Sequence, residues 1–206
     1  MPSVVPPQPS EPISWELEIR SFELRDRRNP PPKGGIVFVG SSTFTLWPEL
    51  VSDFEPLPVL NRGFGGCEIR DVVRYADRII LPYEPRQVVI YAGDNDLANG
   101  RTPTDVFHDY HRLVDIVHAS LPKTLVSFVS IKLSTERLPL ANEIEAANDL
   151  IAAYTKDHTL TSYIDTYDLS LDNTGVPRPE LYYDGLHLNR AGYELWIPVI
   201  RAGLVE

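Results

Sequence analysis

Val37-Phe38-Val39-Gly40-Ser41-Ser42-Thr43 passes from an apolar run into a turn of small residues. The run is short and rich in β-branched residues, which predicts a buried strand. Gly40 allows the backbone to turn sharply and removes a side chain that would block access to the turn. A serine at the end of a buried strand is a candidate nucleophile, but two adjacent serines leave open which hydroxyl would react. Taken alone, a strand-to-helix turn with capping serines is the simpler interpretation.

Short apolar runs of the same kind recur along the chain and alternate with longer helical patterns. Strands are predicted at 36–39, 57–60, 87–91, 124–131 and 162–164. Helices are predicted at 68–80, 104–120 and 138–156, and a last helix begins near Arg190. Asn189 is its expected cap, and Pro198 is expected to kink or end it. This alternation predicts an α/β fold, in which a parallel sheet carries helices on both faces and binds ligands beyond the carboxyl ends of its strands.

The N-terminal region differs from the rest of the chain. Residues 1–12 are rich in proline and predict a loosely packed arm. Trp15, Ile19 and Phe22 recur at helical spacing, so residues 14–28 are predicted to form an amphipathic helix on the surface of the domain. The segment 29–35, rich in proline and glycine, ends this helix. We therefore divide the chain into an arm with its helix, residues 1–33, and one domain, residues 34–206.

The composition is that of a globular protein with an acidic balance. Hydrophobic residues make up 43% of the chain, and 19 Lys and Arg against 29 Asp and Glu give a formal charge of -10. This charge disfavours nucleic acid and anionic membranes as partners, because both are polyanions. The lone Cys67 excludes an internal disulfide and a multi-cysteine metal site. We expect a soluble cytoplasmic protein, because no secretory signal is recognisable and no apolar run approaches the ~20 residues of a membrane span.

Two further loops follow predicted strands. Asn61-Arg62-Gly63-Phe64-Gly65-Gly66 contains three glycines that would let a backbone N–H approach a developing oxyanion, although a flexible turn is an equally good interpretation. Tyr91-Ala92-Gly93-Asp94-Asn95-Asp96 carries a side-chain amide that could donate to the same oxyanion. Asp94 and Asp96 could suggest a cation site, but capping and turn roles are favoured for both carboxylates.

A carboxylate and an imidazole stand three residues apart in Tyr183-Asp184-Gly185-Leu186-His187. A serine hydroxyl is a poor nucleophile until an imidazole takes its proton, and the imidazole needs a carboxylate to fix its tautomer and orientation. Asp184 and His187 could supply both groups from one turn, although this spacing by itself is more often structural. The other histidines are His108, His111, His118 and His158. A solvated helix face is favoured over a metal site for the first three.

Together the four loops resemble the SGNH, or GDSL-like, hydrolase superfamily. Its four blocks supply a Ser, a Gly, an Asn and a His in that order, which correspond here to Ser42, Gly66, Asn95 and His187. The resemblance runs from about residue 36 to the C-terminus. The first block of the family usually reads Gly-Asp-Ser, whereas this chain has Ser41 in place of the Asp. That Asp is not the triad carboxylate, so its replacement alters the loop without removing a member of the triad.

The resemblance implies a three-layer α/β/α sandwich with about five parallel strands in flavodoxin-like order. It also implies an esterase- or lipase-type activity on a small-molecule ester, with no cofactor and no metal. Ser42 would be the nucleophile, His187 the base and Asp184 the group that orients it. The oxyanion hole would consist of the backbone N–H groups of Ser42 and Gly66 and the amide of Asn95.

Three alternatives stay open at this point. The enzyme could transfer its acyl group to an alcohol or a sugar, or the chain could be a binding protein that has kept the fold and lost hydrolysis. A metal-dependent hydrolase built on His108 and His111 is the third. The segment 132–142 follows a strand and is either a border of the acyl pocket or an ordinary loop. The sequence does not determine the oligomeric state.

Overall fold

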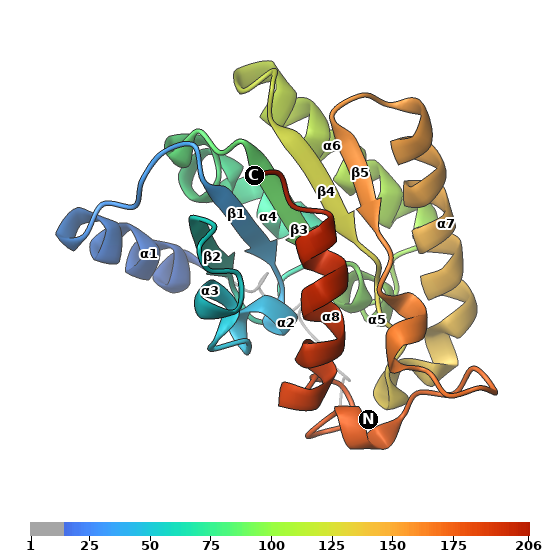
Figure 1. The fold of residues 1–206 in the computed structure, drawn as a ribbon. Coiled ribbons are helices and arrows are strands. Elements are labelled where there is room, and N and C mark those ends of the chain that lie inside the picture. The colour runs from blue at the N-terminus through green and yellow to red at the C-terminus, as the bar shows by residue number, and fades with distance from the viewer. Residues whose placement is uncertain (1–14) are drawn as a thin grey trace, which may run out of the picture.

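Five parallel strands form one sheet in the computed structural model, which describes residues 15–206 (Figure 1). The strands are β1 (Ile36–Gly40), β2 (Val59–Gly63), β3 (Gln87–Tyr91), β4 (Leu125–Val129) and β5 (Thr161–Ile164). Their order across the sheet is β2-β1-β3-β4-β5, and each neighbouring pair is parallel. This is the flavodoxin-like order, in which the direction of strand addition reverses beside β1.

Helices cover both faces of the sheet, so the predicted three-layer α/β/α sandwich is confirmed (Figure 1). One face carries α4 (Ile69–Ile79), α6 (Pro103–Ser120) and α7 (Ala141–Asp157), and the other carries α2 (Ser42–Thr45), α3 (Leu50–Asp53) and α8 (Arg190–Ala202). Successive side chains of β1 alternate between the two layers, because a strand points its residues to opposite faces in turn. Val37 and Val39 pack under α4, whereas Ile36 and Phe38 pack under α8.

The predicted N-terminal helix is present as α1 (Glu16–Arg28). Its Ile19 and Phe22 are buried in the apolar cluster on the α4 face. The arm predicted at 1–12 lies outside the described residues, and the division of the chain at residue 33 stays a prediction.

None of the helices in residues 15–206 is long and apolar enough to cross a membrane.

Three of the differences from the predicted boundaries involve a proline. The strand expected at 57–60 is Val59–Gly63, because Pro58 has no N–H to donate to the ladder. The helix expected at 138–156 is Ala141–Asp157, preceded by a 3-10 helix, Thr135–Leu140, that contains Pro139. Pro198 was expected to kink or end the last helix, and it does not end it, since α8 continues to Ala202. Buried Trp196 and Ile200 on either side of the proline hold it against the sheet.

The carboxyl ends of the strands place the predicted site residues at one edge of the sheet. Gly40 makes this possible at the end of β1, where its φ is 142° and a Cβ would lie 1.9 Å from the carbonyl oxygen of Tyr91 on β3. No other residue fits there, so β1 can end against β3 only with glycine at this position. The turn that follows begins α2 with Ser42 as its first residue.

Candidate active site

Ser42, His187 and Asp184 form one continuous chain of hydrogen bonds. His187 Nε2 lies 2.9 Å from Ser42 Oγ, and His187 Nδ1 lies 2.6 Å from Asp184 Oδ2. Ser42 and His187 are 145 residues apart in the sequence. The neighbouring Ser41 is fully buried, and its hydroxyl has no hydrogen-bond partner among the described residues. The fold therefore brings the second of the two serines, and not the first, to the imidazole.

The Asp184 loop is held by its own backbone. Asp184 Oδ1 accepts hydrogen bonds from the N–H groups of Leu186, at 3.0 Å, and His187, at 2.7 Å. A bridge between Tyr182 and Leu188 closes the base of the loop. Burial alone would raise the pKa of Asp184, but the hydrogen bonds from the His187 ring and from these two N–H groups outweigh burial and lower that pKa to about 2. Asp184 is therefore ionised over the neutral pH range.

Asn95 and Gly66 lie next to each other, beside the serine. Asn95 stands in the short helix α5 (Asp94–Ala98), and its Nδ2 donates to the carbonyl oxygen of Cys67, the residue after Gly66, at 3.1 Å. This bond uses one of the two amide hydrogens and leaves the other for a ligand. A Cβ placed on Gly65 would lie 4.0 Å from Ser42 Cβ, so the glycine loop also borders the serine. The structure thus brings all five sequence-predicted residues to one edge of the sheet.

Two aromatic side chains beside this edge were not predicted as site residues. A Cβ on Gly66 would lie 3.3 Å from Cη2 of Trp15, so the indole ring at the start of α1 lies against the glycine loop. The Tyr183 ring stacks on the His187 ring at a centroid distance of 5.7 Å, and its side chain is exposed. Helical spacing had placed Trp15 on an amphipathic helix at the surface of the domain, and no local pattern reveals its contact with the loop at Gly66.

A groove adjoins the site between α1 and the loops that follow β1 and β2. It is lined in part by Phe22, Thr45, Asn61 and Gly65, and Gly65 forms its border toward Ser42. A second cavity lies around the amino ends of β1 and β2, at the other end of the strands from the serine. Because the hydrogen-bonded residues stand at the carboxyl ends, the first of these two grooves lies on their side of the sheet.

The two carboxylates near the site make the capping and turn contacts predicted for them, and the cysteine beside them is buried. Asp96 accepts a hydrogen bond from the N–H of Ile69 at 3.1 Å and so caps α4. Asp94 accepts from the N–H of Asn95 at 3.0 Å. Cys67 is fully buried, and burial raises the pKa of its thiol well above the usual range.

The remaining histidines make local contacts. His118 and His158 each bond a backbone carbonyl oxygen, and His111 Nδ1 lies 3.4 Å from Asp115. Within residues 15–206 there is no group of three or more His, Cys, Asp or Glu side chains that could hold a metal ion.

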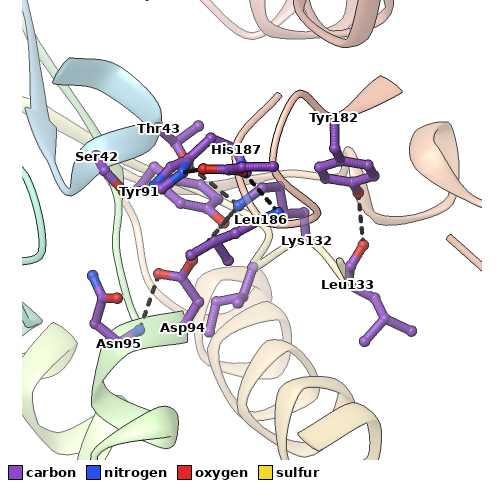
Figure 2. A network of polar contacts seen from close by, with 12 residues as sticks. Ser42, Thr43, Tyr91, Asp94, Asn95, Lys132, Leu133, Tyr182, Leu186 and His187 are labelled. Atoms are coloured by element: carbon purple, nitrogen blue, oxygen red, sulfur yellow. Dashed lines mark hydrogen bonds and ion pairs between the residues drawn. The ribbon is translucent and has the colours of Figure 1, made fainter. Parts of the chain in front are cut away.

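Lys132 departs most from expectation. The segment 132–142 was a candidate border of an acyl pocket, but the side chain of Lys132 is only 1% exposed and points beneath the serine loop (Figure 2). Its Nζ lies 3.0 Å from Tyr91 Oη and 3.3 Å from Thr43 Oγ1. The signal in the sequence was a single charge between Ile131 and Leu133, directly after a buried strand.

Comparison with known proteins identifies the family of the chain and its structural relatives. The model of the GDSL-like lipase/acylhydrolase family matches residues 35–195. No curated protein matches the chain. Similar solved structures include a Streptococcus pneumonia protein provisionally described as a platelet activating factor, with 18% identity, TM-score 0.81 and 92% of each chain covered.

Two others carry more specific descriptions. A GDSL-like lipase from Bacteroides thetaiotaomicron has 19% identity and TM-score 0.74, over 90% of this chain and 96% of that one. A mutant of an acetyl-xylooligosaccharide esterase from Geobacillus has 14% identity and TM-score 0.65, over 85% and 97%. At these identities, the structural likeness establishes the shared fold alone.

Proposed function

The chain belongs to the GDSL-like lipase/acylhydrolase family and is a hydrolase, and from that premise we propose that it cleaves carboxylic esters through an acyl-enzyme on Ser42. The observation that carries the proposal is the hydrogen-bonded chain from Ser42 Oγ through the His187 ring to Asp184. A serine is made nucleophilic by an imidazole in hydrogen-bond contact, and the imidazole by a carboxylate that fixes its other nitrogen as a donor.

The residue chemistry gives the order of events. His187 Nε2 takes the proton of Ser42 as Oγ attacks the ester carbonyl, and the ionised Asp184 stabilises the imidazolium that forms. His187 then protonates the leaving alcohol. Water, activated by the same imidazole, attacks the acyl-enzyme and releases the acid, so the enzyme returns to its starting state without a cofactor.

We assign the oxyanion hole to the backbone N–H groups of Ser42 and Gly66 and to the amide of Asn95. Two observations support this assignment: the bond from Asn95 Nδ2 to the Cys67 carbonyl, and the contact of the glycine loop with Ser42. Fixed donors at this position stabilise the charge that develops on the carbonyl oxygen and need not reorganise during the reaction.

Small esters are the proposed substrates. The groove beside Ser42 has polar as well as apolar lining, including Asn61, Thr45 and Phe64. Trp15 lies against the glycine loop at Gly66. Acyl transfer to an alcohol or sugar is the alternative outcome of the same acyl-enzyme, and the experiment below distinguishes the two.

The adjacent serines provide a matched test. We expect purified Ser42→Ala to hydrolyse p-nitrophenyl acetate at least about 10³-fold more slowly than wild type, because the nucleophile is lost. Ser41→Ala removes a buried hydroxyl that bonds to nothing in the described chain, so it should stay within a few-fold of wild type. Equal rates for wild type and Ser42→Ala would exclude the proposed mechanism.

The same assay separates hydrolysis from transfer. Product analysis in the presence of glycerol or an acetyl-acceptor sugar should show free acetate as the main product if the enzyme is a hydrolase. Accumulation of the new ester at the expense of acetate would instead assign the chain to the acyltransferases.

A panel of p-nitrophenyl esters from acetate to decanoate tests the preference for small acyl groups. This preference predicts the highest kcat/KM for the esters with the shortest acyl chains.

A further inference from the structure

The mechanism above does not use Lys132, whose ammonium is buried beneath the site. Its side chain is 1% exposed, and its partner carboxylate on Asp94 is 3% exposed, with 3.6 Å between Nζ and Oδ2. Taking both charges out of water carries a large desolvation penalty, and a methionine of similar length would fill the space at less cost. The position of the pair therefore calls for an explanation other than packing.

Lys132 contacts the nucleophile loop directly. Its Nζ donates to the hydroxyl of Thr43, the residue after Ser42, and to Tyr91 Oη at the end of β3. Tyr193 on α8 holds the same residue from the other side, by donating to the Thr43 carbonyl oxygen at 2.8 Å. The first turn of α2, which carries Ser42 Oγ, is thus fixed by a side-chain bond and a backbone bond at one residue.

The ion pair also reaches the oxyanion loop. Asp94 Oδ2 faces Lys132, while Asp94 Oδ1 accepts from the N–H of Asn95 at 3.0 Å (Figure 2). The carboxylate therefore connects the buried cation to the start of α5, where the Asn95 side chain stands. The Lys132–Asp94 pair therefore links Thr43, which follows the nucleophile, with Asn95.

The backbone next to Lys132 is tied to the third loop of the site. Tyr182 Oη donates to the Leu133 carbonyl oxygen at 2.8 Å, and the N–H of Glu136 donates to the Gly185 carbonyl oxygen at 3.1 Å. Both bonds join the segment after β4 to the loop that carries Asp184 and His187. Lys132 thus lies where the nucleophile loop, the oxyanion loop and the histidine loop converge.

We propose that Lys132 is a positioning residue for the reaction, whose ammonium fixes the Ser42 turn and the Asn95 loop relative to each other through Thr43 and Asp94. This inference rests on the proposed function. Lys132 does not touch Ser42 Oγ, so it acts through its neighbours. Displacing reacting groups by about 1 Å can cost on the order of 10²-fold in rate, which sets the size of the expected effect.

The test uses Lys132→Met in the ester assay. We expect kcat to fall about 10–100-fold while KM changes less than about threefold, because the substrate still binds but meets a displaced nucleophile. The rate at which a fluorophosphonate labels Ser42 should fall by a similar factor. Wild-type kcat in Lys132→Met, with Ser42→Ala inactive, would overturn the inference and leave the proposed function intact.

A double variant separates positioning from stability. Lys132→Met alone leaves Asp94 buried without its cation and should lower the unfolding temperature. Adding Asp94→Asn removes that charge, so we expect the unfolding temperature to recover and kcat to stay low. Recovery of both together would show that the pair only stabilises the fold, and the positioning role would be wrong.

Thr43 gives an independent readout if Lys132→Met does not fold. Thr43→Val removes the hydroxyl that Lys132 contacts and keeps the shape of the side chain, whereas Thr43→Ser keeps the hydroxyl. We expect kcat to fall in the valine variant by about tenfold or more and to stay within about threefold of wild type in the serine variant. Equal activity of the two variants would contradict the link from Lys132 to the Ser42 turn.

Discussion

Asn95 shows how much of the site depends on single atoms. Its side-chain nitrogen has two hydrogens, of which one bonds the Cys67 carbonyl oxygen and orients the amide. The second hydrogen is available to a substrate oxygen. The bond to Cys67 therefore has a positioning effect within the proposed oxyanion hole, since it fixes the direction of a donor before any charge develops.

Replacing Asn95 by Ala removes one oxyanion donor. We expect a fall of roughly 10²–10³ in kcat with little change in KM, because the donor acts on the transition state more than on the bound ester. Steady-state kinetics on p-nitrophenyl acetate measure this effect. Asn99→Ala is a suitable control, because it removes a neighbouring amide that bonds Glu68 and faces no proposed substrate. Similar losses in the two variants would point to disruption of the loop and not to a missing donor.

At the scale of elements, the start of α4 depends on a residue from another helix. Glu68 and Asp71 form a capping box, in which Asp71 accepts from the N–H of Glu68 at 2.9 Å. Asp96 on α5 accepts from the N–H of Ile69 and completes the cap from outside. Burial, and then the neighbouring Glu68 carboxylate, raise the pKa of Asp96 to about 7.

This raised pKa makes part of the stability depend on pH. The folded state favours the protonated form of Asp96 more than the unfolded state does. The contribution of this side chain to the free energy of unfolding is therefore full below about pH 3.8 and is lost as the pH rises through about 7. From pH 5 to pH 8, the unfolding free energy of wild type should therefore fall relative to that of Asp96→Asn by on the order of 2 kcal/mol. Urea unfolding of both proteins at the two pH values measures this difference.

Asp105 provides a control of the opposite sign. Its carboxylate accepts from the N–H and the hydroxyl of Thr102, which lower its pKa. A lowered pKa gives a contribution to the free energy of unfolding that is lost only as the pH falls below about 3.8. Asp105→Asn should therefore not change how the free energy of unfolding varies between pH 5 and 8. Equal slopes for wild type and Asp96→Asn would contradict the assignment of a neutral Asp96.

At the scale of the whole molecule, a buried arginine joins α1 to β2, the outermost strand of the sheet. Arg62 on β2 is 4% exposed and stacks between the rings of Phe22 and Tyr83, at 5.0 and 4.8 Å from their centroids. Its guanidinium donates to Asp26 at 2.5 Å and to Tyr83 Oη at 2.9 Å. Because α1 begins beside Trp15, this attachment also sets one wall of the approach to the glycine loop.

Breaking this attachment should cost far more than removing a surface charge. Arg62→Met leaves Asp26 without its cation and loses two stacking contacts, so we expect a loss of roughly 2–4 kcal/mol in unfolding free energy. Arg20→Ala removes an exposed pair with Glu16 four residues away and should cost far less, because solvent screens the two charges. Urea unfolding compares the two variants. Equal losses would show that Arg62 contributes no more than a solvated ion pair.

The sequence by itself determined the layers, the strand order implied by its family resemblance, and which loops meet at one edge. These follow from patterns that act over a few residues: apolar runs of strand length, helical spacing, caps such as Asn189, and the turn that joins Asp184 to His187. The boundaries near the prolines at 58, 139 and 198 were not predicted correctly. The pairing of the strands and the packing of the helices decide how the structure accommodates a residue that has no N–H to donate.

The family resemblance implied Ser42 as the nucleophile, but the residues of the turn left both serines open, and the tertiary structure decided how each is placed and what lies beneath them. Ser41 and Ser42 are neighbours with the same chemistry, yet one is buried under the loop and the other bonds His187. The contacts of Lys132 and Trp15 likewise join segments that are 40 residues or more apart. Such contacts depend on how the helices pack on the sheet, and no local spacing in the chain encodes the direction in which these side chains point.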